Sequence, residues 1–148
     1  MVTLKQIAQA CGVSVASVSK ALNDAKDIGP ATNERIIHTA REMGYFPNAA
    51  ARALKTNRTY NIGVLFEDNT ESGLTHEYFS YILNAVKKEV EAHGYDITFI
   101  NRNIGSMKMS FLEHCRYRNC DGLVIANVDF SDPDVTALAD CEIPMVSI

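Results

Sequence analysis

The sequence has no tryptophan, few prolines and no apolar stretch near the ~20 residues that a membrane-spanning helix needs. Its four cysteines form no CxxC pair, and its four histidines have no metal-ligand spacing with the cysteines or with one another. The N-terminus also has no apolar segment of signal-peptide length. We therefore expect a cytoplasmic protein with reduced thiols and without a metal site or a transmembrane segment.

The signatures of several enzyme classes are also absent from the sequence. The patterns GxGxxG, GxxxxGK[ST] and GxSxG do not occur, so we predict no dinucleotide fingerprint, phosphate loop or nucleophile elbow. We interpret the acidic residues Asp129, Asp132 and Asp134 as a solvated loop rim and a helix cap. We expect neither enzymatic activity nor a cofactor.

Charge is unevenly distributed along the chain, although the net charge of −4 is acidic overall. Residues 1–58 carry a net charge of +4, and the remaining residues carry −8. A basic head on an acidic body is typical of a polyanion-binding region joined to a region that does not touch the polyanion. The acidic overall balance therefore does not exclude a nucleic-acid-binding protein.

The N-terminal residues have the pattern of a helix-turn-helix. A capping box at Thr3 predicts a first helix over residues 4–11, Gly12 predicts its end, and Ser14 predicts the N-cap of a second helix. A short turn that contains glycine, between two short helices, is typical of this DNA-binding motif. The same pattern also fits a plain three-helix bundle whose second helix lies on the surface.

The second helix has an apolar side and a side of mostly short chains. The predicted inner residues are Val18, Ala21 and Leu22, and the predicted outer residues are Val15, Ala16, Ser19 and Lys20. Short outer side chains would let the helix approach base edges in a major groove closely. Candidate hydrogen-bonding partners of phosphates are Ser14, Ser17 and Asn23.

An alanine-rich segment at residues 49–55 follows the predicted head and favours a helix of about two turns. Such a short helix is marginal in water on its own, and a symmetry mate lying on DNA could supply its partner. Its one large apolar side chain, Leu54, has no predicted core to enter, so it could wedge into a minor-groove step. The alternative is an ordinary connector between domains.

From residue 61 onward the pattern alternates between strands and helices. The predicted strands are 62–66, 97–100, 123–126 and 145–148, and the predicted helices are 78–93, 108–118 and 133–138. This alternation predicts a doubly wound, open parallel sheet. Ligand sites in such sheets lie at the carboxyl ends of the strands.

Short segments along the chain have the order and spacing of a known family. They are Thr3-Leu4, Ile7-Ala8, Gly12-Val13-Ser14, Val18-Ser19, Leu22-Asn23, Gly44-Tyr45-Phe46-Pro47-Asn48, Ala51-Arg52-Ala53-Leu54, Ile62-Gly63-Val64, Gly94-Tyr95, Asp121-Gly122 and Ile143-Pro144-Met145-Val146. On these segments the chain resembles the N-terminal part of a repressor of the lactose and purine repressor family. The resemblance implies an all-α helix-turn-helix DNA-binding head (1–46), a hinge helix and linker (47–60), and a partial α/β effector domain like the periplasmic binding proteins (61–148).

The resemblance also assigns roles to residues of the DNA-binding region. It implies that bases are read in the major groove by Val15, Ala16 and Lys20. It places Ser14, Ser17, Asn23 and Thr32 near phosphates. It places Leu54 and Lys55 at the minor-groove end of the hinge helix, and we include Asn48 among the DNA-binding residues. Gly29 and Asn33 depart from the serine and arginine common in the family, which puts two phosphate contacts in doubt.

In this family a small effector, such as a sugar or a nucleobase, binds in a cleft between two subdomains. The resemblance places Tyr78 and Phe79 near the effector, with Asn127 as a further candidate, although both aromatic residues could simply pack the first helix on the sheet. Family members are longer than this chain, so we expect a fragment that has lost its effector response. The predicted function is a dimeric repressor that binds a palindromic operator, and the alternative is a sugar-binding module without operator activity.

Overall fold

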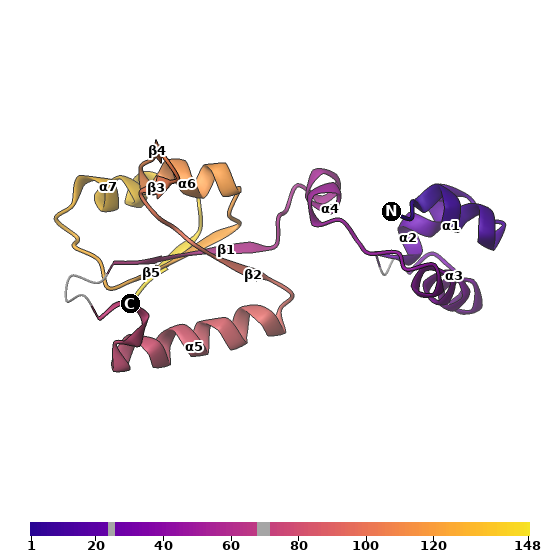
Figure 1. Ribbon diagram of the computed structural model, residues 1–148, viewed down its shortest axis with the longest axis horizontal. Helices are drawn as coiled ribbons and strands as arrows, with labels where there is room; N and C mark the ends of the chain where they lie inside the picture. Colours follow the sequence, from indigo (N-terminus) through magenta and orange to yellow (C-terminus); the bar gives the residue numbers. More distant parts are fainter. Residues whose placement is uncertain (24–25, 68–71) are drawn as a thin grey trace. The chain divides into compact units, whose positions relative to one another are not determined.

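The computed structural model describes residues 1–23, 26–67 and 72–148, which form two compact units, Met1–Asn48 and Ala49–Ile148 (Figure 1). The finer boundaries at residues 46 and 60 stay predictions. Within the described ranges, every helix is too short or too polar to span a lipid bilayer.

The first unit contains three helices, α1 (Leu4–Cys11), α2 (Val15–Ala21) and α3 (Pro30–Glu42). Thr3 and Gln6 form the predicted capping box of α1, and Gly12 ends that helix with a left-handed φ of 62°. Each helix then contributes a fully buried apolar side chain to one core, namely Ile7, Val18 and Ile36. The helical head predicted from the sequence is confirmed.

The second unit begins with helix α4 (Ala49–Thr56), none of whose residues is buried. The chain then enters the sheet through a corner held by the Asp121 carboxylate, which accepts the backbone N–H groups of Thr59 at 3.1 Å and Tyr60 at 2.8 Å. The Arg52 guanidinium lies 3.9 Å above the centre of the Tyr60 ring. The Asp121 contacts fix where the linker joins the sheet.

The sheet of the second unit is entirely parallel and has the order β2-β1-β5-β6. Its strands are β1 (Asn61–Phe66), β2 (Asp96–Phe99), β5 (Gly122–Ala126) and β6 (Met145–Ser147). One face is covered by α5 (Glu77–Ala92), and the other by α6 (Phe111–Arg118) and α7 (Pro133–Thr136) (Figure 1). The strand order changes direction at β1, so the carboxyl ends of β1 and β5 mark the switch point at which ligands bind in such sheets.

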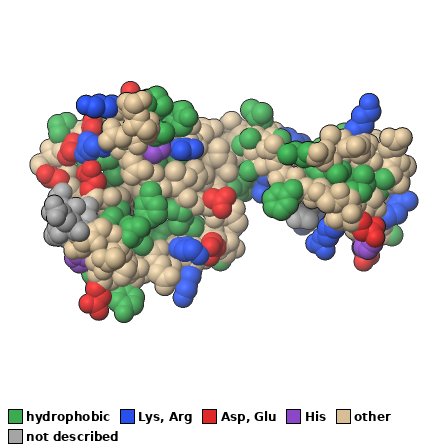
Figure 2. All heavy atoms as spheres, viewed as in Figure 1, with side chains coloured by type: hydrophobic (Ala, Val, Ile, Leu, Met, Phe, Trp, Pro, Cys, Tyr) green, Lys and Arg blue, Asp and Glu red, His purple; other side chains and the backbone are tan. Residues whose placement is uncertain are grey.

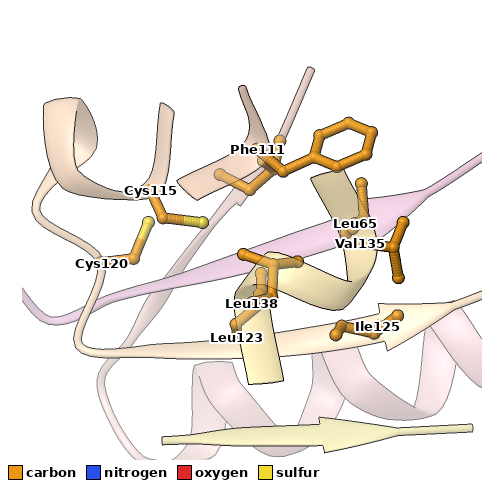
Figure 3. Close-up of a cluster of buried hydrophobic side chains, with 9 residues drawn as sticks. Leu65, Phe111, Cys115, Cys120, Leu123, Ile125, Val135 and Leu138 are labelled. Carbon is orange, nitrogen blue, oxygen red and sulfur yellow. The ribbon is translucent and has the colours of Figure 1, made fainter. Parts of the chain in front are cut away.

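A buried cluster fills the layer between the sheet and α6 (Figure 3). It joins Leu65 and Ile125 from the sheet to Phe111 and Cys115 from α6, and Leu138 closes it. All five of these side chains are at most 4% exposed. The continuous apolar runs of β1 and β5 are therefore explained by burial on the inner strands of a parallel sheet.

The structure corrects the predicted start of the helix at residues 108–118. Residues 107–108 belong instead to a small antiparallel hairpin of β3 (Asn103–Ile104) and β4 (Met107–Lys108). Helix α6 begins only at Phe111, because Ser110 and Glu113 form a capping box there. The structure also adds a short 3₁₀ helix that we did not predict, η1 (Gly73–Thr75), and divides the helix predicted at 133–138 into α7 and the 3₁₀ helix η2 (Ala137–Asp140).

The opposite face of the sheet is covered less completely. No residue of α5 is buried, although apolar residues of this helix face the strands. A hollow of about 510 Å³ lies between α5 and the strands, lined among others by Leu83, Val86, Val90 and Phe99. Hydrophobic side chains are visible over this hollow (Figure 2).

Gly63 in β1 offers a test of the packing on the inner strand. A Cβ at this position would lie 3.0 Å from Ile100 Cγ1 and 3.0 Å from Leu123 Cδ1. We expect Gly63→Ala to lower the free energy of unfolding by about 1–3 kcal/mol, since overpacked cores force their neighbours to shift. Urea denaturation followed by circular dichroism measures the change. A free energy of unfolding equal to that of the native chain would contradict the expected crowding.

Candidate nucleic-acid interface and effector edge

Helix α2 has one buried side and one exposed side. Its N-cap is Ser14, whose hydroxyl accepts the Ser17 N–H at 3.0 Å. Val18 and Ala21 on the inner side are 0% exposed, whereas Val15 on the outer side is 45% exposed. The predicted division of α2 into a core side and an exposed side is confirmed, and Ala16 and Lys20 are exposed with Val15.

The predicted phosphate-binding side chains lie around the ends of α2 and near the start of α3. The Ser14 and Ser17 hydroxyls are 2.9 Å apart, and the Asn23 amide donates to the Ser19 carbonyl at 2.6 Å. These local bonds stabilise both ends of the helix that carries the candidate base-reading residues. Thr32 is half-buried in the first turn of α3, and the further DNA-binding candidate Asn48 is exposed. The contacts of all these residues with DNA stay predictions.

An ion pair at the C-terminal end of α2 was not predicted from the sequence. The Lys20 ammonium donates to the Asp27 carboxylate. This bond lowers the pKa of Asp27, so the carboxylate is ionised at neutral pH and the pair is lost only as the pH falls through that lowered value. The single long cation on the outer face of α2 is therefore engaged before any DNA arrives.

Helix α4 exposes its one large apolar side chain. Leu54 is 89% exposed, and no residue of the helix is buried. Lys55 is exposed beside it. An exposed leucine on a two-turn helix fits the predicted wedge into a minor groove, and this role stays a prediction.

The predicted effector residues lie near the carboxyl ends of β1 and β5. Phe79 is half-buried and its ring is 5.5 Å from that of Phe66 at the end of β1, so it does pack α5 on the sheet. Tyr78 is 60% exposed, with its ring 5.0 Å from that of Phe79. Asn127 has a left-handed φ of 53°, and its carbonyl accepts the N–H of Glu67 at 3.1 Å.

The same edge holds an ion-pair cluster that sequence reasoning missed. The guanidinium of Arg102, just after β2, contacts Glu67 at 3.0 Å, Asp132 at 2.6 Å and Asp134 at 2.7 Å. Its carbon lies 4.1 Å above the centre of the Phe111 ring. The cluster, with Glu67 as its largest contributor, raises the pKa of Arg102. Asp132 accepts the Asp134 N–H at 2.8 Å, which confirms a helix cap among the acidic residues of this loop. The Asp132 and Asp134 carboxylates both bind Arg102, so they are not merely a solvated rim.

Comparison with protein families matches both parts of the chain. Residues 3–48 match the family described as bacterial regulatory proteins, lacI family. Residues 59–148 match the periplasmic binding proteins and sugar binding domain of the LacI family. The chain therefore belongs to the LacI family.

Individual relatives agree with this assignment. The HTH-type transcriptional regulator RafR of Escherichia coli is 32% identical over 99% of this chain, and the HTH-type transcriptional repressor PurR of Erwinia tasmaniensis is 31% identical over 99%. The crystal structure of a lac repressor dimer bound to operator and the anti-inducer ONPF superposes with a TM-score of 0.70 at 25% identity, and covers 99% of this chain. The chain spans only 42–44% of the length of these three proteins.

Removing the Arg102 cation from the ion-pair cluster should destabilise the sheet domain. We expect Arg102→Gln to lower the free energy of unfolding by about 1–2 kcal/mol, because three carboxylates would remain close together without their shared partner. The control, Lys87→Gln, breaks only an exposed pair with Glu91 on α5, and should change stability by about 0.3–0.5 kcal/mol. Urea denaturation compares the two variants, and a loss no larger for Arg102→Gln would show that the cluster contributes nothing beyond a surface pair.

Proposed function

We propose that this chain is the DNA-binding part of a cytoplasmic transcriptional repressor that binds a pseudo-palindromic operator as a dimer. The observation that carries the proposal is the capped helix α2, which exposes Val15, Ala16 and Lys20 on a region of net charge +4. A positive region supplies the sequence-independent attraction to phosphates, and an exposed helix supplies the reading of base edges. Membership of the LacI family supports this role.

The residues on the outer face of α2 limit which bases can be read. Val15 and Ala16 can offer only apolar contact, for example to thymine methyl groups, while Lys20 can donate to the O6 and N7 acceptors of guanine. The hydrogen-bonding groups around this face then fix the register of the helix on the duplex by binding phosphates. These are Ser14, Ser17, Asn23, Thr32 and Asn48.

The hinge helix gives the proposed dimer its second contact. With eight residues and none buried, α4 is too short to be stable by itself, so a second copy of α4 in the minor groove would supply the missing partner. Leu54 from each copy would wedge into the central base step, with Lys55 near the backbone. Two linked heads also bind more tightly than one because the second binds at a high effective concentration.

The sheet domain is proposed to bind a small sugar-like or nucleobase-like effector at the carboxyl edge of β1 and β5. Tyr78 and Asn127 would contact this ligand, and Phe79 would support Tyr78 from the sheet. The support is the position of these residues at the topological switch point and the sugar-binding family that residues 59–148 match.

Selection of binding sites from randomised duplex DNA at near-physiological salt tests the proposed repressor. We expect an enriched palindrome for the native chain, loss of the central-step preference in Leu54→Ala, and relaxed preference at one guanine per half-site in Lys20→Met. Each lost base contact should cost about 1–3 kcal/mol. If no sequence is enriched and binding disappears with modest added salt, operator reading is refuted, and the sugar-binding module remains as the alternative function.

The ion pair on α2 gives a second prediction. Asp27→Asn frees the Lys20 ammonium and removes a carboxylate that would repel phosphates, so DNA affinity should rise several-fold, with a salt-dependence slope steeper by up to about one unit. Glu34→Gln removes one acid from the exposed surface of α3 without touching Lys20 and serves as the control for net charge. An equal gain in both variants, measured by fluorescence anisotropy over a range of salt concentrations, would mean that net charge and not the Lys20 pair sets the affinity.

A further inference from the structure

Two cysteines meet at the end of helix α6. Cys115 lies in the last turns of the helix and Cys120 just after its end, where Asn119 adopts a left-handed φ of 53°. The Cys120 N–H donates to the Cys115 carbonyl at 3.0 Å, which is the long bond of a Schellman motif. Both side chains belong to the same buried cluster and lie side by side in it (Figure 3).

We propose that Cys115 and Cys120 are a site of oxidative modification, at which a peroxide converts the two thiols into a reversible disulfide. Disulfides require Cα atoms roughly 4.4–6.8 Å apart, and the Schellman hydrogen bond holds these two backbones close together. The two side chains also lie side by side in the buried cluster, so no large movement of the chain is needed to join their sulfurs. The proposal depends on this corner alone and not on DNA binding.

The surroundings give the two thiols different chemical roles. The neighbouring Cys115 thiol lowers the pKa of Cys120 against the opposing effects of burial and Asp121, whereas the proximity of Cys120 and burial raise the pKa of Cys115. Cys120 is 9% exposed and Cys115 is fully buried. Because the thiolate is the reactive form, Cys120 is the nucleophile and Cys115 is the thiol that resolves the intermediate.

The reaction balances with a peroxide as the only oxidant. The Cys120 thiolate attacks one oxygen of the peroxide, the O–O bond breaks, and the leaving alkoxide or hydroxide takes up a proton, which leaves a sulfenic acid on Cys120. The Cys115 sulfur then attacks the Cys120 sulfur, and the S–O bond breaks. The thiol proton and the hydroxyl group leave as water. An added dithiol reverses the modification by exchange.

The modified corner also holds the linker to the sheet. The Asn119 carbonyl accepts the Thr59 hydroxyl at 2.6 Å, and Asp121 accepts the N–H groups of Thr59 and Tyr60. Drawing Cys120 toward Cys115 moves the residues on either side of it. We therefore expect faster amide exchange at Thr59 and Tyr60 in the oxidised chain than in the reduced chain.

Peptide mapping of the chain treated with hydrogen peroxide tests the site. Cleavage after Arg116, Arg118 and Phe130 by trypsin and chymotrypsin puts Cys115, Cys120 and Cys141 on three separate peptides. We expect the first two peptides to be linked without reductant and to separate with dithiothreitol. A linkage to Cys141, a linkage between chains, or two free thiols after this treatment would overturn the proposal.

Two variants assign the roles and provide the control. In Cys115→Ser the nucleophile remains without its resolving thiol, so dimedone should trap a sulfenic acid on Cys120. Cys141→Ser leaves both partners in place and should form the disulfide as the native chain does. Amide exchange of the oxidised Cys141→Ser chain then gives the second readout, and unchanged protection of Thr59 and Tyr60 would refute the coupling to the linker.

Discussion

The Asp121 carboxylate fixes the linker to the sheet. It stands directly before β5, and it accepts two consecutive N–H groups from the chain that enters β1, those of Thr59 and Tyr60. Tyr60 has a positive φ of 56°, a conformation that a bulky residue holds only when its surroundings fix it. Because β1 and β5 are neighbours in the sheet, one carboxylate sets where the strand begins and how α4 is joined to it.

Most of the fold could be predicted because its signals are local. Thr3, Ser14 and Gly12 mark helix ends by bonds to residues within four positions, and the apolar runs of β1 and β5 require burial on both faces of a sheet. The outer face of α2 followed from helical periodicity alone. The start of α6 was wrong by three residues because the capping box at Ser110 and the hairpin before it were overlooked.

The candidate sites were predictable only in part, since their key contacts join residues far apart in sequence. Arg102 binds Glu67 and Asp132 across 30 or more residues, and no sequence pattern reports that pairing. The Lys20–Asp27 pair spans seven positions and depends on the path of the chain after α2. The two cysteines at the end of α6 are close in sequence, but the sequence alone does not show that their side chains meet. That contact depends on the left-handed turn at Asn119.

Strand β6 lies at one edge of the parallel sheet. In the part of the chain that the structure describes, β6 pairs with β5 on one side only, and Met145 and Val146 are 36% and 54% exposed. An open strand edge with exposed apolar side chains is a template to which another strand can add. In the described residues, this edge is therefore the place where a further strand, from the same polypeptide or from another, would extend the sheet.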